Sequence, residues 1–209
     1  KQLAEKDIHV VGNSVVDAIH LCLEKIKQNP EPYKKSLTNQ NIDLNNRIIL
    51  TTLHRRESFG KPFDSICQAL QNIATEFPNT QIVFPLHPNP KVHESMAPLK
   101  NIANILLIPP LNYPDMIYLM KHSSLILTDS GGIQEEAPSL QTPTLILRNV
   151  TERMEGVEAG TAVLIGTKRN NIVKEVRRWI ENTNMQANFA ENPYGDGKTS
   201  ASIMSIIKQ

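Results

Sequence analysis

The sequence predicts an α/β fold built on a doubly wound parallel sheet. Short apolar, β-branched segments alternate along most of the chain with segments whose apolar residues recur at helical spacing. The apolar segments, such as residues 125–127 and 145–147, are continuous and do not alternate with polar residues. Strands of this composition are typical of a parallel sheet that helices cover on both faces. The length of 209 residues suits one domain, or at most two small ones, with a sizeable core.

The first expected element is a helix that starts after Asn13, a good N-cap, and ends by Pro30. Val16, Ile19 and Ile26 are among its regularly spaced apolar residues. Residues 29–46 are polar, contain two prolines and show no period, which predicts a surface loop or linker.

The alternation of strands and helices begins after this loop. Six strands are expected, at residues 47–53, 81–86, 104–108, 124–128, 143–147 and 162–165. The helices are expected at residues 63–77, entered through Pro62, and at 90–100, 114–122, 132–140 and about 171–183. Ile203, Ile206 and Ile207 predict a final helix, which we expect to pack outside this domain.

Charge and composition narrow the range of partners. Lys plus Arg number 22 and Asp plus Glu 21, so the formal charge is +1 and no broad basic field exists for a nucleic acid. No segment approaches the ~18 consecutive apolar residues of a membrane span, and residues 1–6 lack the apolar core of a signal peptide. We therefore expect a cytoplasmic protein. Cys22 and Cys67 lie in expected helices, which predicts buried, reduced thiols.

The turn after the strand at 124–128 is the first candidate site. Gly131 and Gly132 open a helix directly behind this strand, so backbone N–H groups converge where no side chain blocks an anion. The Ser130 hydroxyl adds a further donor. The plain alternative is that the two glycines only make a tight turn. Glu136, one turn into the helix, is either an exposed acid or a carboxylate that accepts hydrogen bonds from sugar hydroxyls.

Two further turns place a histidine at the carboxyl end of a strand. His54 follows the strand at 47–53 and His87 the strand at 81–86. Together with Arg55 and Arg56 they suit a phosphate or sugar site, although the arginines equally suit a solvated loop. No H-E-x-x-H and no cysteine pair at ligand spacing occurs, so we expect no metal site.

The fourth turn, residues 148–157, follows the strand at 143–147 and carries a run of charged side chains. A guanidinium in this turn would neutralise a diphosphate, whereas the alternative is an ordinary solvated loop. Taken together, the four turns offer donors for an anion but few candidate bases.

Five motifs in these turns and near the C-terminus carry a resemblance. They are T-D-S-G-G-I-Q-E-E-A-P at 128–138, H-R-R-E at 54–57, H-x-N-P at 87–90, T-E-R at 151–153 and N-P-Y-G-D-G at 192–197. In their order along the chain they resemble the non-hydrolysing UDP-N-acetylglucosamine 2-epimerase family, and the match spans nearly the whole chain. V-x-G-N-S-V-x-D at 10–17 is similar to the stretch where that family passes from its first domain into its second.

The resemblance implies an architecture and an activity. It implies that residues 1–209 are the C-terminal, Rossmann-like, UDP-binding half of a two-domain GT-B fold. We expect residues 1–12 and about 192–209 to pack against the absent N-terminal domain. The family interconverts UDP-N-acetylglucosamine and UDP-N-acetylmannosamine by elimination and re-addition of UDP, without a cofactor. A homodimer is implied for the full-length protein.

The resemblance also implies roles for individual residues. Its diphosphate-binding turn matches Ser130, Gly131 and Gly132, and its ribose-binding carboxylate matches Glu136. Its catalytic residues, which act near the sugar and diphosphate, match His54 and Arg153. A second, allosteric UDP-N-acetylglucosamine is bound in some members at positions that match Arg55, Glu57 and His87.

Two departures from the family matter. Met154 stands where the family usually has Pro, so the backbone restraint on Arg153 is lost. The acid and base carboxylates of the family belong to its first domain, so we expect this chain alone to be inactive. Three alternatives stay open: a hydrolysing epimerase, the donor domain of a GT-B glycosyltransferase, and a nucleotide-binding module without turnover.

Overall fold

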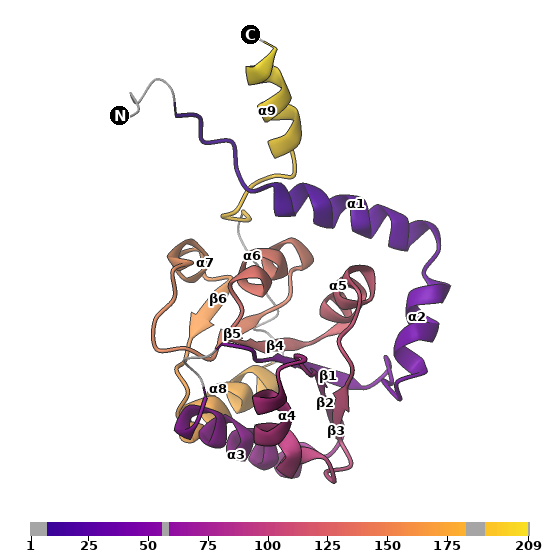
Figure 1. The fold of residues 1–209 in the computed structure, drawn as a ribbon, viewed down its shortest axis with the longest axis vertical. Helices are drawn as coiled ribbons and strands as arrows, with labels where there is room; N and C mark the ends of the chain where they lie inside the picture. Colours follow the sequence, from indigo (N-terminus) through magenta and orange to yellow (C-terminus); the bar gives the residue numbers. More distant parts are fainter. Residues whose placement is uncertain (1–7, 56–58, 183–190, 209) are drawn as a thin grey trace.

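A six-stranded, all-parallel sheet forms the centre of the molecule (Figure 1). The computed structural model describes residues 8–55, 59–182 and 191–208. The sheet has the order β3-β2-β1-β4-β5-β6. Its strands are β1 (Arg47–Thr52), β2 (Thr80–Pro85), β3 (Ile105–Ile108), β4 (Leu125–Thr128), β5 (Thr144–Ile146) and β6 (Ala162–Leu164).

Helices cover both faces of the sheet (Figure 1). One layer contains α3 (Lys61–Glu76), α4 (Pro90–Met96) and α8 (Arg169–Glu181). The opposite layer contains α1 (Ser14–Gln28), α2 (Glu31–Thr38), α5 (Tyr113–His122) and α6 (Gly131–Leu140). The short helix α7 (Met154–Glu158) precedes β6, and α9 (Thr199–Ile207) ends the described chain.

Alternate residues of β1, β2, β3 and β4 supply two separate cores. In β1, Ile49 packs in the core beneath α3, whereas Ile48 and Leu50 pack in the core beneath α1 and α5. All three side chains are fully buried, which explains why the strand shows a continuous apolar run here. The continuous apolar pattern that predicted a parallel, doubly covered sheet is therefore confirmed.

Most expected elements are confirmed, with shifted bounds. All six strands occur within two residues of the predicted positions. The helix expected at 90–100 is α4 followed by a 3₁₀ turn, Ala97–Leu99. The last two helices begin earlier than expected: α8 starts at Arg169, and α9 starts at Thr199, ahead of its isoleucines.

The loop predicted for residues 29–46 is wrong in its first part, because this segment contains α2. Pro32 lies in the first turn of α2, where a missing N–H does no harm. Leu37 is the one fully buried side chain of the helix, so too few apolar residues recur for a period to be visible. The five-residue α7, which overlaps the turn at 148–157, was also missed, because its one buried residue, Gly156, has no side chain that could show a period.

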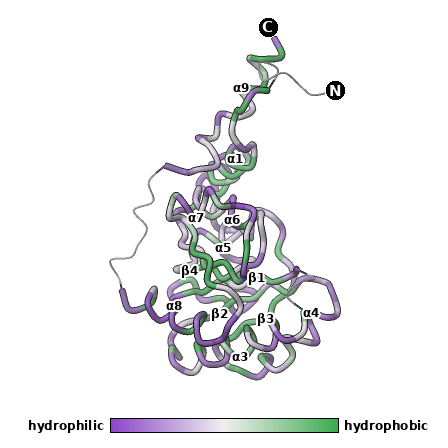
Figure 2. The backbone as a smooth tube through the Cα atoms, turned by 90° about the vertical axis from the view of Figure 1, so that its left-hand side faces the viewer, coloured by the Kyte–Doolittle hydropathy of each residue, from purple (hydrophilic) through white to green (hydrophobic). Residues whose placement is uncertain are grey.

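The two chain segments that flank the sheet meet beside α1. Asn13 caps α1 as predicted, because its side chain accepts a hydrogen bond from the Val15 N–H (3.0 Å). Asp17 in the first turn of α1 accepts hydrogen bonds from the N–H groups of Thr199 (3.2 Å) and Ser200 (2.9 Å) at the start of α9. The helix α9 itself stands away from the sheet, and much of it is hydrophobic (Figure 2).

Cys22 and Cys67 are buried free thiols, as predicted, and burial raises the pKa of both. Within the described ranges, none of the helices combines the length and the apolar character that crossing a membrane requires.

The missed helix α2 supplies a test of the fold. Leu37→Ala is expected to lower the free energy of unfolding by about 2–5 kcal/mol, because it leaves a cavity at a fully buried position. Leu21→Ala on α1 removes the same atoms from a side chain that is 61% exposed, and is expected to change stability by only about 0.5 kcal/mol. Urea denaturation measures both, and equal effects would contradict the packing of α2.

Candidate functional site

The strand order places a crevice at the carboxyl ends of β1 and β4. These neighbouring strands are followed by helices on opposite faces, α3 after β1 and α6 after β4. Ligands of doubly wound sheets bind at such a switch point, where the two connections diverge. The last residues of the two strands, Thr52 and Thr128, are hydrogen-bonded through their hydroxyls (2.6 Å).

A buried carboxylate, Asp129, organises this crevice. It accepts hydrogen bonds from the backbone N–H groups of His54 (3.1 and 3.2 Å) and Arg55 (3.0 Å). Its Oδ1 also lies 3.1 Å from His54 Nδ1. The Arg55 Nε in turn donates to the Asp129 carbonyl oxygen (3.1 Å). Asp129 therefore holds both the backbone and the ring of His54 in one orientation.

Sequence reasoning assigned no role to Asp129. The available signal was a carboxylate placed directly after four buried strand residues, where a side chain without partners would be costly.

His54 and His87 lie side by side at the ends of β1 and β2, as predicted. Their rings stack with centroids 5.8 Å apart and an interplanar angle of 24°. His87 is exposed and its Nδ1 accepts a hydrogen bond from the Asn89 N–H (3.2 Å). The two imidazoles thus form one edge of the crevice.

The N-terminus of α6 opens into the same crevice. Ser130 is the N-cap, and its hydroxyl lies 3.5 Å from the Ile133 N–H. The N–H groups of Gly131 and Gly132 stand at the start of the helix, where the α-helix provides no intrahelical acceptor. These donors and the positive end of the helix dipole make this position suitable for an anion.

Two guanidinium groups lie over Gly131. A Cβ atom at this position would lie 3.3 Å from Cζ and Nε of Arg153 and 3.4 Å from Nη2 of Arg55. A glycine therefore lets both cations approach the backbone at the start of α6. This convergence of positive groups is the strongest feature of the site, and it favours the anion-binding interpretation over a mere tight turn.

The two arginines of the charged turn at 148–157, Arg148 and Arg153, make different contacts. Arg148 forms a two-pronged ion pair with Glu152, with distances of 2.8 and 3.0 Å. The hydrogen bonds from Arg148 lower the pKa of Glu152 to about 2. Arg148 thus braces the turn, whereas Arg153 lies over Gly131.

Glu136 is half-buried and is not the exposed acid of the alternative interpretation. Burial, together with the neighbouring charge of Glu135, raises the pKa of Glu136 to about 7. The pKa of Tyr113 on α5 is raised to about 12, first by burial and then by the charge of Glu136. Glu136 therefore faces the gap between α6 and α5, one turn behind the glycines.

A small, mostly apolar cavity of about 220 Å³ adjoins the histidines and Ser130. Its lining comes from the ends of β1 and β2, the segment after β3, α5 and α6. The apolar lining residues are Leu53, Pro85, Leu86, Pro88, Pro110, Leu111, Met116 and Ile133. A flat ring such as a nucleobase suits a cavity of this size and character.

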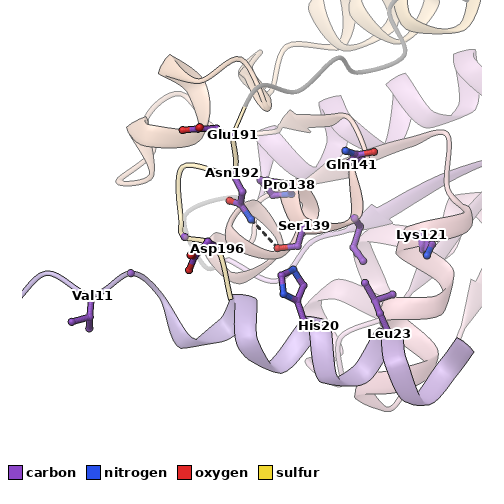
Figure 3. A pocket seen from close by; sticks show the side chains of 13 residues that line it. Val11, His20, Leu23, Lys121, Pro138, Ser139, Gln141, Glu191, Asn192 and Asp196 are labelled. Carbon is purple, nitrogen blue, oxygen red and sulfur yellow. Dashed lines mark hydrogen bonds between the residues drawn. The ribbon is translucent and has the colours of Figure 1, made fainter. Parts of the chain in front are cut away.

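A larger cavity of about 820 Å³ lies elsewhere, between the start of α1, the end of α6 and residues 191–196 (Figure 3). His20 and Leu23 reach from α1 towards Ser139, whose hydroxyl accepts a hydrogen bond from Asn192 (2.8 Å; Figure 3). The lining includes none of the predicted site residues, and its charged groups have both signs.

The structure brings most of the predicted site residues together. His54, Arg55, His87, Ser130, Gly131, Gly132 and Arg153 surround one crevice, with Glu136 one turn deeper. Arg56 and Glu57 lie outside the described residues. Among the side chains that the structure describes, no three able to hold a metal ion come together.

Comparisons with known proteins agree with this geometry. A sequence profile described as UDP-N-acetylglucosamine 2-epimerase matches residues 1–208. The UDP-N-acetylglucosamine 2-epimerase of Yersinia pestis is 46% identical over 209 residues, which cover 98% of this chain and 55% of that protein.

Solved structures extend the likeness to the fold. The UDP-GlcNAc 2-epimerase of Neisseria meningitidis bound to UDP-GlcNAc matches with a TM-score of 0.91 and 38% identity, covering 99% of this chain and 57% of that one. The Methanocaldococcus jannaschii enzyme in complex with UDP-GlcNAc and UDP has a TM-score of 0.84 and 32% identity, covering 99% and 56%.

This chain spans little more than half the length of these relatives. Its Rossmann-like sheet corresponds to the C-terminal half of the GT-B fold. Because profile, sequence and fold agree over nearly every residue, the chain belongs to the UDP-N-acetylglucosamine 2-epimerase family.

Proposed function

We propose that this chain is the UDP-binding half of an isomerase that interconverts UDP-N-acetylglucosamine and UDP-N-acetylmannosamine. The observation that carries the proposal is the convergence of Arg153 and Arg55 on Gly131 at the start of α6. A diphosphate at this position receives backbone N–H groups, a hydroxyl and two cations from one side. The complexes of the two relatives with UDP-GlcNAc and UDP support the choice of ligand.

The surroundings of the anion position suit the rest of the nucleotide. The apolar cavity beside Ser130 accepts the uracil ring, with Met116 and Leu111 among its walls. The Glu136 carboxylate accepts hydrogen bonds from the ribose hydroxyls. Its raised pKa supports this role, because a half-buried carboxylate gains more from two new donors than a solvated one.

The chemistry is an elimination followed by a re-addition. A base removes the C2 proton, the bond from C1 to the diphosphate oxygen breaks, and UDP departs with the electron pair. The resulting 2-acetamidoglucal accepts UDP again at C1, while a proton returns to the opposite face of C2. The donors over Gly131 stabilise the charge that develops on departing UDP.

His54 stabilises the same charge from the other edge of the crevice. Its contact with the Asp129 carboxylate means that Nδ1 carries a proton, since a carboxylate only accepts. Nε2 is the ring nitrogen that this contact leaves for the ligand, and in this proposal it contacts the sugar or diphosphate. The acid and base for C2 belong to the remaining half of the protein.

The remaining half packs against both ends of the chain, residues 1–12 and 192–209. The exposed apolar side chains of α9 support this placement, namely Ile203, Met204 and Ile207. The full-length protein is a homodimer in this proposal, and the buried free thiols support a cytoplasmic location. An allosteric role for Arg55, Glu57 and His87 stays a prediction.

Arg153→Ala tests the anion position. UDP binding to this chain is expected to weaken about tenfold or more, because charge-assisted hydrogen bonds are lost. Arg178→Ala on α8 removes the same charge from an exposed arginine paired with Glu175, and is expected to leave UDP affinity unchanged. Calorimetry measures the UDP affinity of both variants. Equal losses of affinity would mean that only the net charge of the chain matters, and would contradict a specific contact with Arg153.

Glu136→Gln tests the ribose contact. UDP affinity is expected to fall about tenfold while pyrophosphate affinity stays the same, because only the nucleotide offers ribose hydroxyls. The affinity of the unsubstituted chain for UDP-N-acetylglucosamine is expected to rise between pH 6 and 8, since Glu136 loses its proton near pH 7. The diphosphate of UDP-N-acetylglucosamine is esterified at both ends, so it does not itself titrate between pH 6 and 8. Equal losses for UDP and pyrophosphate would remove Glu136 from the ribose role.

The activity is tested in the full-length protein that contains this chain. Solvent deuterium is expected to enter C2 of UDP-N-acetylglucosamine, and NMR is expected to show UDP-N-acetylmannosamine as the product. His54→Ala is expected to slow turnover by about 10² with a smaller effect on KM. The 209-residue chain alone is expected to exchange no C2 proton. Release of free N-acetylmannosamine would indicate the hydrolysing reaction instead.

A further inference from the structure

Glu135, next to the proposed ribose carboxylate, lies between two side chains from distant parts of the sequence. Its Oε1 accepts a hydrogen bond from Arg153 Nε (2.8 Å), and its Oε2 accepts one from Asn13 Nδ2 (2.9 Å). Both carboxylate oxygens are therefore used, although the side chain is 20% exposed. Nothing in the anion site itself requires a second acid at this position.

The contact with Glu135 determines which edge of Arg153 meets a ligand. A guanidinium has one N–H at Nε and four at its two Nη atoms. Glu135 uses the N–H at Nε, which leaves the N–H groups at the two Nη atoms for an anion. Glu152 approaches that edge only to 3.9 Å from Nη1, which is too long for a hydrogen bond.

The other partner of Glu135, Asn13, makes two further hydrogen bonds. The Asn13 N–H donates to the Tyr194 carbonyl (2.8 Å), and its Oδ1 caps α1. Gly12 has a φ of 90°, and a Cβ there would lie 3.6 Å from the Cα of Gly195 and 2.9 Å from Thr199 Oγ1. The segments before α1 and before α9 therefore cross in contact, and we call residues 12–13 and 194–195 the crossing.

We propose that Glu135 is a positioning residue that anchors the Arg153 guanidinium to the crossing. The inference rests on the proposed function, since it assumes a diphosphate over Gly131. A long side chain that is held before the ligand arrives loses less conformational entropy on binding. Arg153 then meets the diphosphate in one orientation, set by Glu135 and Asn13.

A donor–acceptor swap tests the proposal. Glu135→Gln turns one oxygen into a donor that faces Asn13 Nδ2. Asn13→Asp keeps the helix cap but sets two carboxylates against each other. In the double variant, the new carboxylate at position 13 accepts from the new amide at position 135, whose remaining oxygen accepts from Arg153 Nε. Each single substitution is expected to weaken UDP binding about tenfold, and the double variant is expected to return within about threefold of the unsubstituted chain.

The direction of the change in UDP affinity distinguishes a positioning role of Glu135 from an effect of net charge. Glu135→Gln removes a negative charge near an anion, so a purely electrostatic role predicts tighter UDP binding. Positioning predicts weaker binding. Glu135→Gln is also expected to have no further effect when Arg153→Ala is present. A gain in affinity for Glu135→Gln, a double variant that is not rescued, or additive losses with Arg153→Ala would each overturn the proposal.

A second measurement needs no substitution. In the NMR spectrum of the unliganded chain, the Arg153 Nε–H is expected to exchange with water at least about tenfold more slowly than that of the exposed Arg178, because hydrogen bonding protects it. Equal exchange rates would overturn the anchoring, even if a variant failed to fold.

The outcomes also distinguish this proposal from the proposed function. If the unsubstituted chain bound no UDP, both the proposed function and the role of Glu135 would fail. If UDP bound but the swap gave no rescue, only the role of Glu135 would fail.

Discussion

The Asp129 carboxylate joins the two strands between which the candidate site lies. A buried carboxylate is unfavourable unless several donors stabilise it, and Asp129 accepts bonds from two backbone N–H groups beyond the end of β1. The same contacts fix the start of the segment that carries His54 and Arg55. The stacked imidazoles and the approach of Arg55 to Gly131 depend on that segment being held against β4, whereas Arg153 reaches Gly131 from its own turn.

Two neighbouring acids on α6, beside the candidate site, differ in their surroundings. Glu135 is paired with Arg153 and Asn13, whereas the pKa of Glu136 is raised to about 7 by burial and by the charge of Glu135. Arg148 and Arg153 also differ in their contacts. Arg148 pairs with Glu152 in its own turn, whereas Arg153 lies over Gly131. The contact with Glu135 restrains the side chain of Arg153 at its guanidinium end.

The sequence was sufficient to predict the features that depend on local pattern. Continuous apolar strands, the Asn13 cap and the glycines behind β4 were all readable from residues close together in the chain. The helix α2 was not, because its only fully buried side chain, Leu37, cannot form a period. The roles of Asp129 and Glu135 could not be predicted for a different reason. Their partners are 75 and 122 residues away, and only the strand order and the crossing bring them together.

The hydrogen bond between Asn13 and Tyr194 has an evolutionary consequence. The whole parallel sheet lies between these two residues in the sequence, yet they touch in space. A unit attached to the remainder of a protein through two adjacent points behaves as a cassette. Because its two ends leave at one place, such a unit can be inserted into another chain without a change to its own core.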